Sequence, residues 1–410
     1  MNNSLRTMMG AALALGASGL VAEIPEYDDP QLFARVGAGS AFEMPVGSSW
    51  VNSTPALNDQ RQVGLEVGFV APEEEAGIWL GDADGGEVVH LGSDELFGDP
   101  AINNDSVMVW RTAEGAQEGI KRYDPADGST EFLTNAPLGA SGWTSLALNS
   151  AGELGYRASI GFSGRAWVSW DDVDDDAIHL AEDGVDSNSE YAFLFSPSFN
   201  DDRVIAGKGA IGSFSTNQIL TVTSDGTIEV LVEDAELDGD SPFDDFNNGV
   251  GFNNNGQVSF VGQLVGGGSG VYVADSDGWV QYAVEGEDGL ADIEFFSTVI
   301  NDAGLVAFRA FNDAGERAIW LADGDSVVQA LTVGDAVDTD LGPALIGTTN
   351  DDPEFGGNVA LNNAGDLAIS ANVVDAADPQ QSFGRGLFVI PVATELPDPV
   401  FADRFESEDS

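Results

Sequence analysis

The stretch TVINDAGLVAF, residues 298–308, places a bulky apolar residue before Asn301, follows it with a short polar turn and ends in a second apolar run. This order of residue types occurs seven times along the 410 residues of the chain. The seven asparagines are Asn58, Asn103, Asn149, Asn200, Asn253, Asn301 and Asn362. Their spacings run from 45 residues (58 to 103) to 61 residues (301 to 362), which is the range of repeat arrays. One supersecondary unit is therefore repeated seven times.

Each unit is expected to contain four strands. In the sixth unit the apolar runs lie at residues 297–301, 305–311, 317–323 and 326–333. Alternating Val, Ile, Phe and Trp between Gly, Asn and Asp residues predict strands joined by tight turns. Four strands are the number in one propeller blade. We therefore predict an all-β protein, a seven-bladed β-propeller with four-stranded blades.

The two ends of the chain predict how the ring closes. After Asn362 the second and third strands are recognisable at residues 366–373 and 384–392, but Pro-containing residues 393–401 replace the fourth. Residues 31–42, QLFARVGAGSAF, have the character of a fourth strand. We expect Leu32 to Val36 to complete the blade that begins at Ala360. The ring would then close and leave no open sheet edge.

The first 22 residues are typical of a secretory signal. Arg6 precedes the apolar run AALALGASGLVA at residues 11–22, which is too short to span a bilayer. We predict a signal peptide at 1–22, a single propeller domain at 23–396 and an acidic tail at 397–410. The expected location is secreted or periplasmic, without a membrane span.

The chain is strongly acidic, with 70 Asp and Glu against 14 Lys and Arg and a formal net charge of −56. Such a charge repels nucleic acid and anionic lipid, and it is also typical of adaptation to a salty medium. The absence of cysteine excludes disulfides, a thiolate nucleophile and Cys-ligated metal. We expect a monomer with no nucleic-acid partner.

Motifs that would indicate an enzyme are scarce. His90 and His179 occupy the same place in the first and third units, on the expected outermost strand, so we interpret them as structural. Asp/Gly turns such as ADGDS, residues 322–326, resemble fragments of calcium loops, but none completes the ligand set with a distal Glu. We predict no cofactor, with calcium at such a turn as the alternative. The seven asparagines are interpreted as turn residues whose side-chain oxygen accepts a backbone N–H.

One position of the repeat concentrates basic residues. Eight residues after each asparagine stand Glu66, Arg111, Arg157, Lys208, Val261, Arg309 and Ser370. We call this position the basic slot, and we expect its side chains to emerge at the end of the second strand, on one face of the disc. The four cations either pair with carboxylates of neighbouring blades or form a partial basic ring that captures an anionic ligand. Both interpretations remain open from the sequence.

The strings NNAGDLAI (362–369) and NDAGLVAFRA (301–310), the latter followed by AIWLADGD (318–325), resemble repeats of a large group of exported bacterial proteins, mostly uncharacterised. Their units read roughly N-x-x-G-x-V-A-F and then G-I-W/F, and the resemblance covers about Pro55 to Val392. It implies a propeller-like fold and export, without an established activity. Three units lack the turn glycine, at or next to Arg61, Asp105 and Arg203.

The predicted function is a binding or interaction module, not an enzyme, for an extracellular ligand that is anionic, a glycan or a protein. The candidate ligand-binding residues are Arg111, Arg157, Lys208 and Arg309. No catalytic or metal-binding residue is predicted. The alternative is a polysaccharide lyase or another carbohydrate-active enzyme, because several lyases are propellers; a lyase would combine a cationic site with a His or Tyr base.

Overall fold

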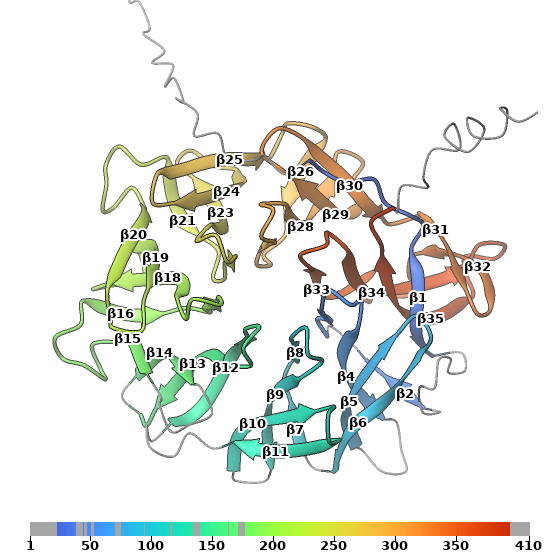
Figure 1. Cartoon of the computed structure of the whole chain (residues 1–410). Coiled ribbons are helices and arrows are strands. Elements are labelled where there is room, and N and C mark those ends of the chain that lie inside the picture. Colours follow the sequence, from blue (N-terminus) through green and yellow to red (C-terminus); the bar gives the residue numbers. More distant parts are fainter. Residues whose placement is uncertain are drawn as a thin grey trace, which may run out of the picture.

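The computed structural model describes residues 23–37, 44, 47–50, 53–69, 75–93, 95–114, 117–133, 140–162, 164–170 and 177–393. The predicted signal peptide (1–22), the last residues of the predicted domain (394–396) and the predicted tail (397–410) lie outside these ranges. The described chain consists of strands and turns, and its seven antiparallel sheets stand in a ring (Figure 1). The predicted all-β, seven-bladed propeller is confirmed.

The first four blades follow one another along the chain. Blade 1 contains β2 (Ser48–Ser49), β3 (Ala56–Leu57), β4 (Val63–Phe69), β5 (Glu75–Asp82) and β6 (Gly85–Ser93). Blade 2 contains β7 (Glu95–Phe97), β8 (Ala101–Ile102), β9 (Met108–Glu114), β10 (Gln117–Asp124) and β11 (Ser129–Leu133). Blade 3 contains β12 (Ala140–Leu148), β13 (Leu154–Ile160), β14 (Gly164–Trp170) and β15 (Ala177–Ala181). Blade 4 contains β16 (Tyr191–Leu194), β17 (Ser198–Phe199), β18 (Ile205–Ile211), β19 (Asn217–Val222) and β20 (Ile228–Glu233).

Three further blades complete the ring. Blade 5 contains β21 (Phe243–Phe246), β22 (Gly251–Phe252), β23 (Val258–Leu264), β24 (Ser269–Asp275) and β25 (Gly278–Val284). Blade 6 contains β26 (Leu290–Ile293), β27 (Val299–Ile300), β28 (Val306–Asn312), β29 (Arg317–Ala322) and β30 (Val327–Thr332). Blade 7 contains β31 (Ala336–Thr339), β32 (Gly342–Ile346), β33 (Phe355–Leu361), β34 (Leu367–Asp375), β35 (Ser382–Ile390) and β1 (Gln31–Val36).

Most blades have an innermost strand that is broken into two pieces. In blade 6, β26 and β27 both pair with β28, which pairs with β29 and then β30. In blade 3 the innermost strand β12 is continuous, with register shifts along its pairing to β13. The breaks matter for function because they place one short loop of each such blade beside the axis of the ring.

The N-terminal strand closes the ring as predicted. β1 pairs antiparallel with β35, from Gln31 opposite Val389 to Val36 opposite Arg385. The buried Arg35 of β1 forms an ion pair of 2.6 Å with Asp340, and this contact lowers the pKa of the Asp340 carboxyl. The hairpin of β31 and β32 was not predicted. It accounts for the longest spacing between asparagines and extends this sheet to six strands.

Seven clusters of buried apolar side chains fill the seven boundaries between neighbouring blades. The bulky residues seven places after the asparagine belong to them: Trp110, Tyr156, Phe260 and Phe308 are all buried. These residues therefore form a packing layer between neighbouring blades. Because each blade buries its faces only against its two neighbours, the stability of the ring resides in these boundaries.

Candidate functional site

The seven asparagine turns meet around the axis of the ring. The side-chain oxygen of Asn253 accepts the N–H groups of Asn255 (3.1 Å) and Gln257 (2.9 Å), as predicted for a turn residue. Its side-chain nitrogen donates to the carbonyl of Asn301 in the next blade, at 2.9 Å. Asn362 donates in the same way to Asn58, at 3.0 Å across the ring closure. The asparagines thus shape the turns, and all but Asn149 also donate to the next blade.

The third residue after each asparagine has a positive φ. It is Gly in four blades, and in the other three it is Arg61, Ser106 and Arg203, with φ values of 61°, 61° and 58°. In blade 2 the residue at this place is Ser106, next to Asp105. Such a conformation is strained for residues other than Gly. Each of the three side chains contacts the preceding blade: Arg61 contacts Asp366, Ser106 contacts Gln62, and Arg203 contacts Glu153. These contacts offset the strain and explain the missing glycines.

The turns line one mouth of the axial channel, a cavity of about 370 Å³. The residues that follow the asparagines include Asp59, Asp201 and Asp302. Their carboxylates accept hydrogen bonds from neighbouring turns, as Asp201 does from the Ser150 N–H at 2.8 Å. Within the described ranges no group of three or more His, Cys, Asp or Glu residues could hold a metal ion. Because hydrogen bonds join neighbouring turns here, we interpret this mouth as a structural ring.

A larger axial cavity of about 680 Å³ adjoins the asparagine mouth. Phe199, Phe252, Ile300 and Leu361 line both cavities, so these side chains form the boundary between them. Every blade contributes to the wall of the larger cavity. In blade order, the contributing residues include Thr54, Asp99, Thr144, Ser196, Gly249, Ser297 and Asn358.

The wall of the axial cavity is rich in hydroxyl groups and is held by hydrogen bonds between blades. The Asn358 N–H donates to the Thr54 hydroxyl at 3.0 Å, and the Asn358 side-chain amide donates to the Ser297 carbonyl at 2.8 Å. The Ser198 hydroxyl donates to the Val250 carbonyl at 2.6 Å. These bonds join blades 6, 7 and 1 and blades 4 and 5. The cavity is therefore formed before any ligand enters it.

Two charged residues lie on this wall, Arg111 and Asp99. The Arg111 side chain is 39% exposed, and its Nη2 lies 3.4 Å from Oε2 of Glu118. The Asp99 carboxylate accepts the Thr54 N–H at 3.0 Å. Asp99 faces the cavity, but protein atoms around its carboxyl exclude part of the water, and this desolvation raises its pKa. Burial and the charge of Asp99 also raise the pKa of Glu66 in blade 1.

The basic slot lies at the centre of the second strand. The expectation that its side chains emerge at the strand end, on one face of the disc, was wrong. Each of the four second strands that carry a cation begins five residues after its asparagine and runs for seven residues, so the eighth residue after the asparagine is the middle one. The four positions are Arg111 in β9, Arg157 in β13, Lys208 in β18 and Arg309 in β28.

Two of these cations are buried contacts between blades. Lys208 is 2% exposed, and its Nζ lies 2.7 Å from both Asp245 Oδ1 and the Phe246 carbonyl of blade 5. Arg309 is 3% exposed, forms an ion pair of 2.8 Å with Glu294 and donates to the Gly357 carbonyl of blade 7. Burial lowers the pKa of Lys208 and of Arg309. Lys208 matches the first interpretation of the slot, because its partner Asp245 belongs to the next blade. Arg309 matches it only in part, since Glu294 belongs to its own blade and the contact with blade 7 is made through the Gly357 carbonyl.

Arg157 occupies an intermediate position. It donates to the Leu194 carbonyl of blade 4 at 3.1 Å and to the Thr144 hydroxyl at 3.0 Å. No carboxylate of the described chain forms an ion pair with it. Since Thr144 lines the axial cavity, Arg157 supports the wall from behind. Of the four slot cations, the structure places Arg111 alone on the wall of the axial cavity. The sequence could not separate the four, because the contacts depend on the inner strand of the next blade.

The histidines lie on outermost strands, His90 on β6 and His179 on β15. Nε2 of the buried His179 lies 2.8 Å from the hydroxyl of the equally buried Ser169, and Nδ1 lies 3.1 Å from the Val222 carbonyl of blade 4. Burial lowers the pKa of His179. This Ser–His pair was not predicted. It is sealed from the axial cavity and joins blades 3 and 4, so we assign it a structural role.

No family model and no curated protein matches the chain. Among solved structures it is similar to an oligogalacturonate lyase in complex with manganese, with 11% identity, a TM-score of 0.55 and coverage of 92% of this chain and 99% of that one. It is also similar to the β-propeller domain of the trilobed protease from Pyrococcus furiosus, which has an open velcro topology, with 13% identity, a TM-score of 0.53 and coverage of 82% and 94%. At these identities the likeness shows a shared propeller fold and nothing about activity.

No helix long and apolar enough to cross a membrane occurs in the part of the chain that the structure describes.

Proposed function

We propose that this chain is an exported binding module that holds an acidic glycan fragment, or a similar anionic ligand, in its axial cavity. The supporting observation is the cavity of about 680 Å³ with a hydroxyl-rich wall and Arg111 as the single cation among its described lining residues. Its volume lies in the range of about 300–1,000 Å³ that is typical of ligand pockets. Hydroxyl and amide groups on the wall match the hydrogen-bonding groups of a sugar.

Arg111 supplies the anchor for the anion. A guanidinium group binds a carboxylate through two parallel hydrogen bonds. Its contact with Glu118 is long at 3.4 Å, and both side chains are more than a third exposed, so this ion pair contributes little and a ligand carboxylate can replace it. The other three slot cations keep the blades together and hold the wall in place.

Asp99 gives the proposed binding a pH dependence. Asp99 lines the same cavity as the anchor. Because desolvation raises the pKa of Asp99, its carboxyl takes up a proton at a higher pH than an exposed Asp does. Protonation removes a negative charge from the wall of the cavity. The affinity for an anionic ligand should therefore increase as the pH falls through this raised pKa.

A glycan array probed with the purified mature protein tests the proposal. We expect binding to uronate-containing or sulfated glycans that weakens as sodium chloride increases, with neutral glycans of the same length as the matched control. Equal binding to neutral and acidic glycans, or binding to none, would refute the proposed ligand class.

The alternative of a polysaccharide lyase is testable with the same preparation. The structurally similar lyase acts on oligogalacturonate. In this chain His90 and His179 lie on outermost strands, and the described lining of the axial cavity contains neither His nor Tyr as a base. We expect incubation with polyuronates to yield no unsaturated, ultraviolet-absorbing product. Formation of such a product would favour the enzyme.

A further inference from the structure

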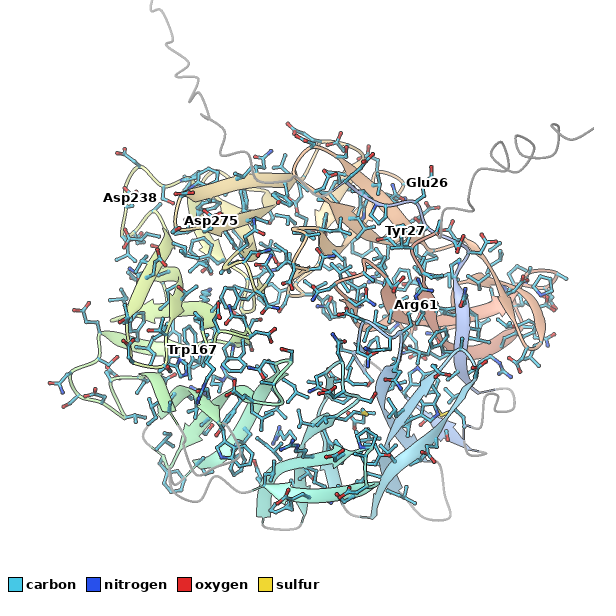
Figure 2. All side chains as sticks on the ribbon, in the orientation of Figure 1. Glu26, Tyr27, Arg61, Trp167, Asp238 and Asp275 are labelled. Atoms are coloured by element: carbon cyan, nitrogen blue, oxygen red, sulfur yellow. The ribbon has the colours of Figure 1, made fainter. Side chains whose placement is uncertain are left out.

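A third cavity of about 410 Å³ lies between blades 4 and 5, away from the axis. We call it the rim pocket. Its lining consists of residues 230–233 of β20, Asp238 and residues 240–242 of the following loop, and Trp279 of β25. Figure 2 shows the labelled Asp238 at the periphery of the ring. None of these residues lines the axial cavity, so the rim pocket is a separate site.

Trp279 departs from the repeat at this place. It is the second residue of the outermost strand β25 and lies opposite Ala274. At this place blade 4 has Ile228 opposite Val222, and blade 6 has Val327 opposite Ala322. The other two blades thus carry an aliphatic residue where blade 5 carries an indole. Trp279 is 42% exposed. An aromatic ring of this size is not needed to maintain the blade.

The orientation of the Trp279 ring is fixed by its neighbours. It packs edge to face against Phe243 and Tyr272, with ring centroids 5.1 and 5.5 Å apart. Both of these rings are buried. Since one side of the indole is held by this cluster, its exposed part forms a rigid apolar surface within the pocket. The partly exposed Val230 adds a second apolar surface.

Carboxylates surround this aromatic surface. Glu233, Asp238 and Asp240 line the pocket, and its described lining contains no Lys, Arg or His. Glu233 Oε1 accepts a hydrogen bond from the Gln218 amide (2.8 Å), and Asp238 Oδ1 accepts the Asp240 N–H (3.0 Å). The Asp240 carboxylate has no hydrogen bond or ion pair among the described residues. The pocket therefore offers an aromatic face together with uncompensated negative charge.

We propose that the rim pocket binds an organic ammonium group. A cation over the face of Trp is the most favourable cation–π arrangement, and Val230 suits the alkyl groups or stem that carry the charge. Asp240, Asp238 and Glu233 supply the opposite charge, and the net charge of −56 raises the local concentration of cations. The ammonium group comes either from a free small molecule or from a lysine side chain of a polypeptide.

Calorimetric titration of the full chain with choline and, separately, with a tetralysine peptide tests the proposal. The neutral alcohol 3,3-dimethylbutanol has nearly the shape of choline and serves as the uncharged control. We expect binding of at least one cation, and affinity about tenfold weaker in Trp279→Val, which copies the residue of blade 6. Asp240→Asn should weaken binding as well. Glu229→Gln, an exposed change on β20 outside the pocket, should not.

The comparison of the two cations identifies the source of the ammonium group, since a free amine should bind as choline does and a lysine donor should favour the peptide. The proposal is overturned if neither cation binds, if the alcohol binds as tightly as choline, or if Trp279→Val binds like the wild type. If Trp279→Val fails to fold, Asp240→Asn serves as the test, because Asp240 is exposed and its carboxylate has no described partner to lose.

Discussion

The boundary between blades 6 and 7 and the boundary between blades 2 and 3 use the same slot differently. At the first, the apolar cluster contains 17 buried residues, and the buried Arg309 donates to the Gly357 carbonyl and pairs with Glu294. At the second, 10 buried apolar residues are described, and Arg111 stays open to the axial cavity. Its neighbour is β12, the unbroken innermost strand, to which Arg111 makes no described hydrogen bond. The next blade, and not the slot itself, decides whether a cation is structural.

Removing the strand that closes the ring should have the largest effect on the stability of the protein. Deleting residues 30–37 removes β1 and with it the buried Phe33, Ala34 and Val36, and it leaves β35 as an open edge. We expect a loss of several kcal/mol and a tendency to aggregate, because apolar burial and edge protection are lost together. Thermal melting and size-exclusion chromatography measure this. An unchanged melting temperature would contradict the closure.

Replacing each of the two slot arginines should change the free energy of unfolding by very different amounts. Arg309→Gln removes a buried cation that pairs with Glu294 and donates to the Gly357 carbonyl. Because Glu294 keeps its ion pair with Arg317 at 2.8 Å, we expect a cost of about 2 kcal/mol. Arg111→Gln removes a long, exposed ion pair and should cost less than about 0.5 kcal/mol. Urea denaturation of both variants measures the difference. Equal losses would mean that Arg111 is a structural contact too.

Two asparagines of the turns should also differ in how much they stabilise the protein, by a smaller amount. Asn253→Ala removes both the turn contacts and the donation to Asn301, and it should cost about 2 kcal/mol. Asn149→Ala should cost about 1 kcal/mol, because its side-chain nitrogen donates to Glu153 of its own turn and to no described group of blade 4. Chemical denaturation separates the two variants. A larger loss for Asn149→Ala would contradict the role of the link between blades.

Salt should have the smallest effect on the difference in stability between the two arginine variants. With 70 carboxylates in the chain, sodium chloride should raise the melting temperature, since the Debye length shrinks from about 10 Å at 0.1 M to about 3 Å at 1 M. The gap between the two arginine variants should persist, because the Arg309 pair is buried and poorly screened. Calcium at matched ionic strength should add nothing. A further rise with calcium would instead indicate ion binding at the Asp-rich turns.

Sequence repetition predicted the fold well and the site poorly, for a physical reason. Asn301 and its six counterparts fix the turns and the blade number locally, and residues 31–36 carry a strand pattern of their own. The basic slot was found by counting, but its orientation depends on pairing register, and its exposure depends on the inner strand of another blade. Trp279 lies on β25 and was not singled out from the sequence, because only the three-dimensional pocket gives its exposure a meaning.

The measurement that most directly tests the central claim is calorimetric titration of an oligouronate into the wild type and the Arg111→Gln variant, with the melting temperature of each recorded alongside. If Arg111 is the anchor of the axial cavity, the variant should melt like the wild type and bind about tenfold more weakly or not at all. An Arg111→Gln protein that melts normally and binds the oligouronate as tightly as the wild type would contradict the claim.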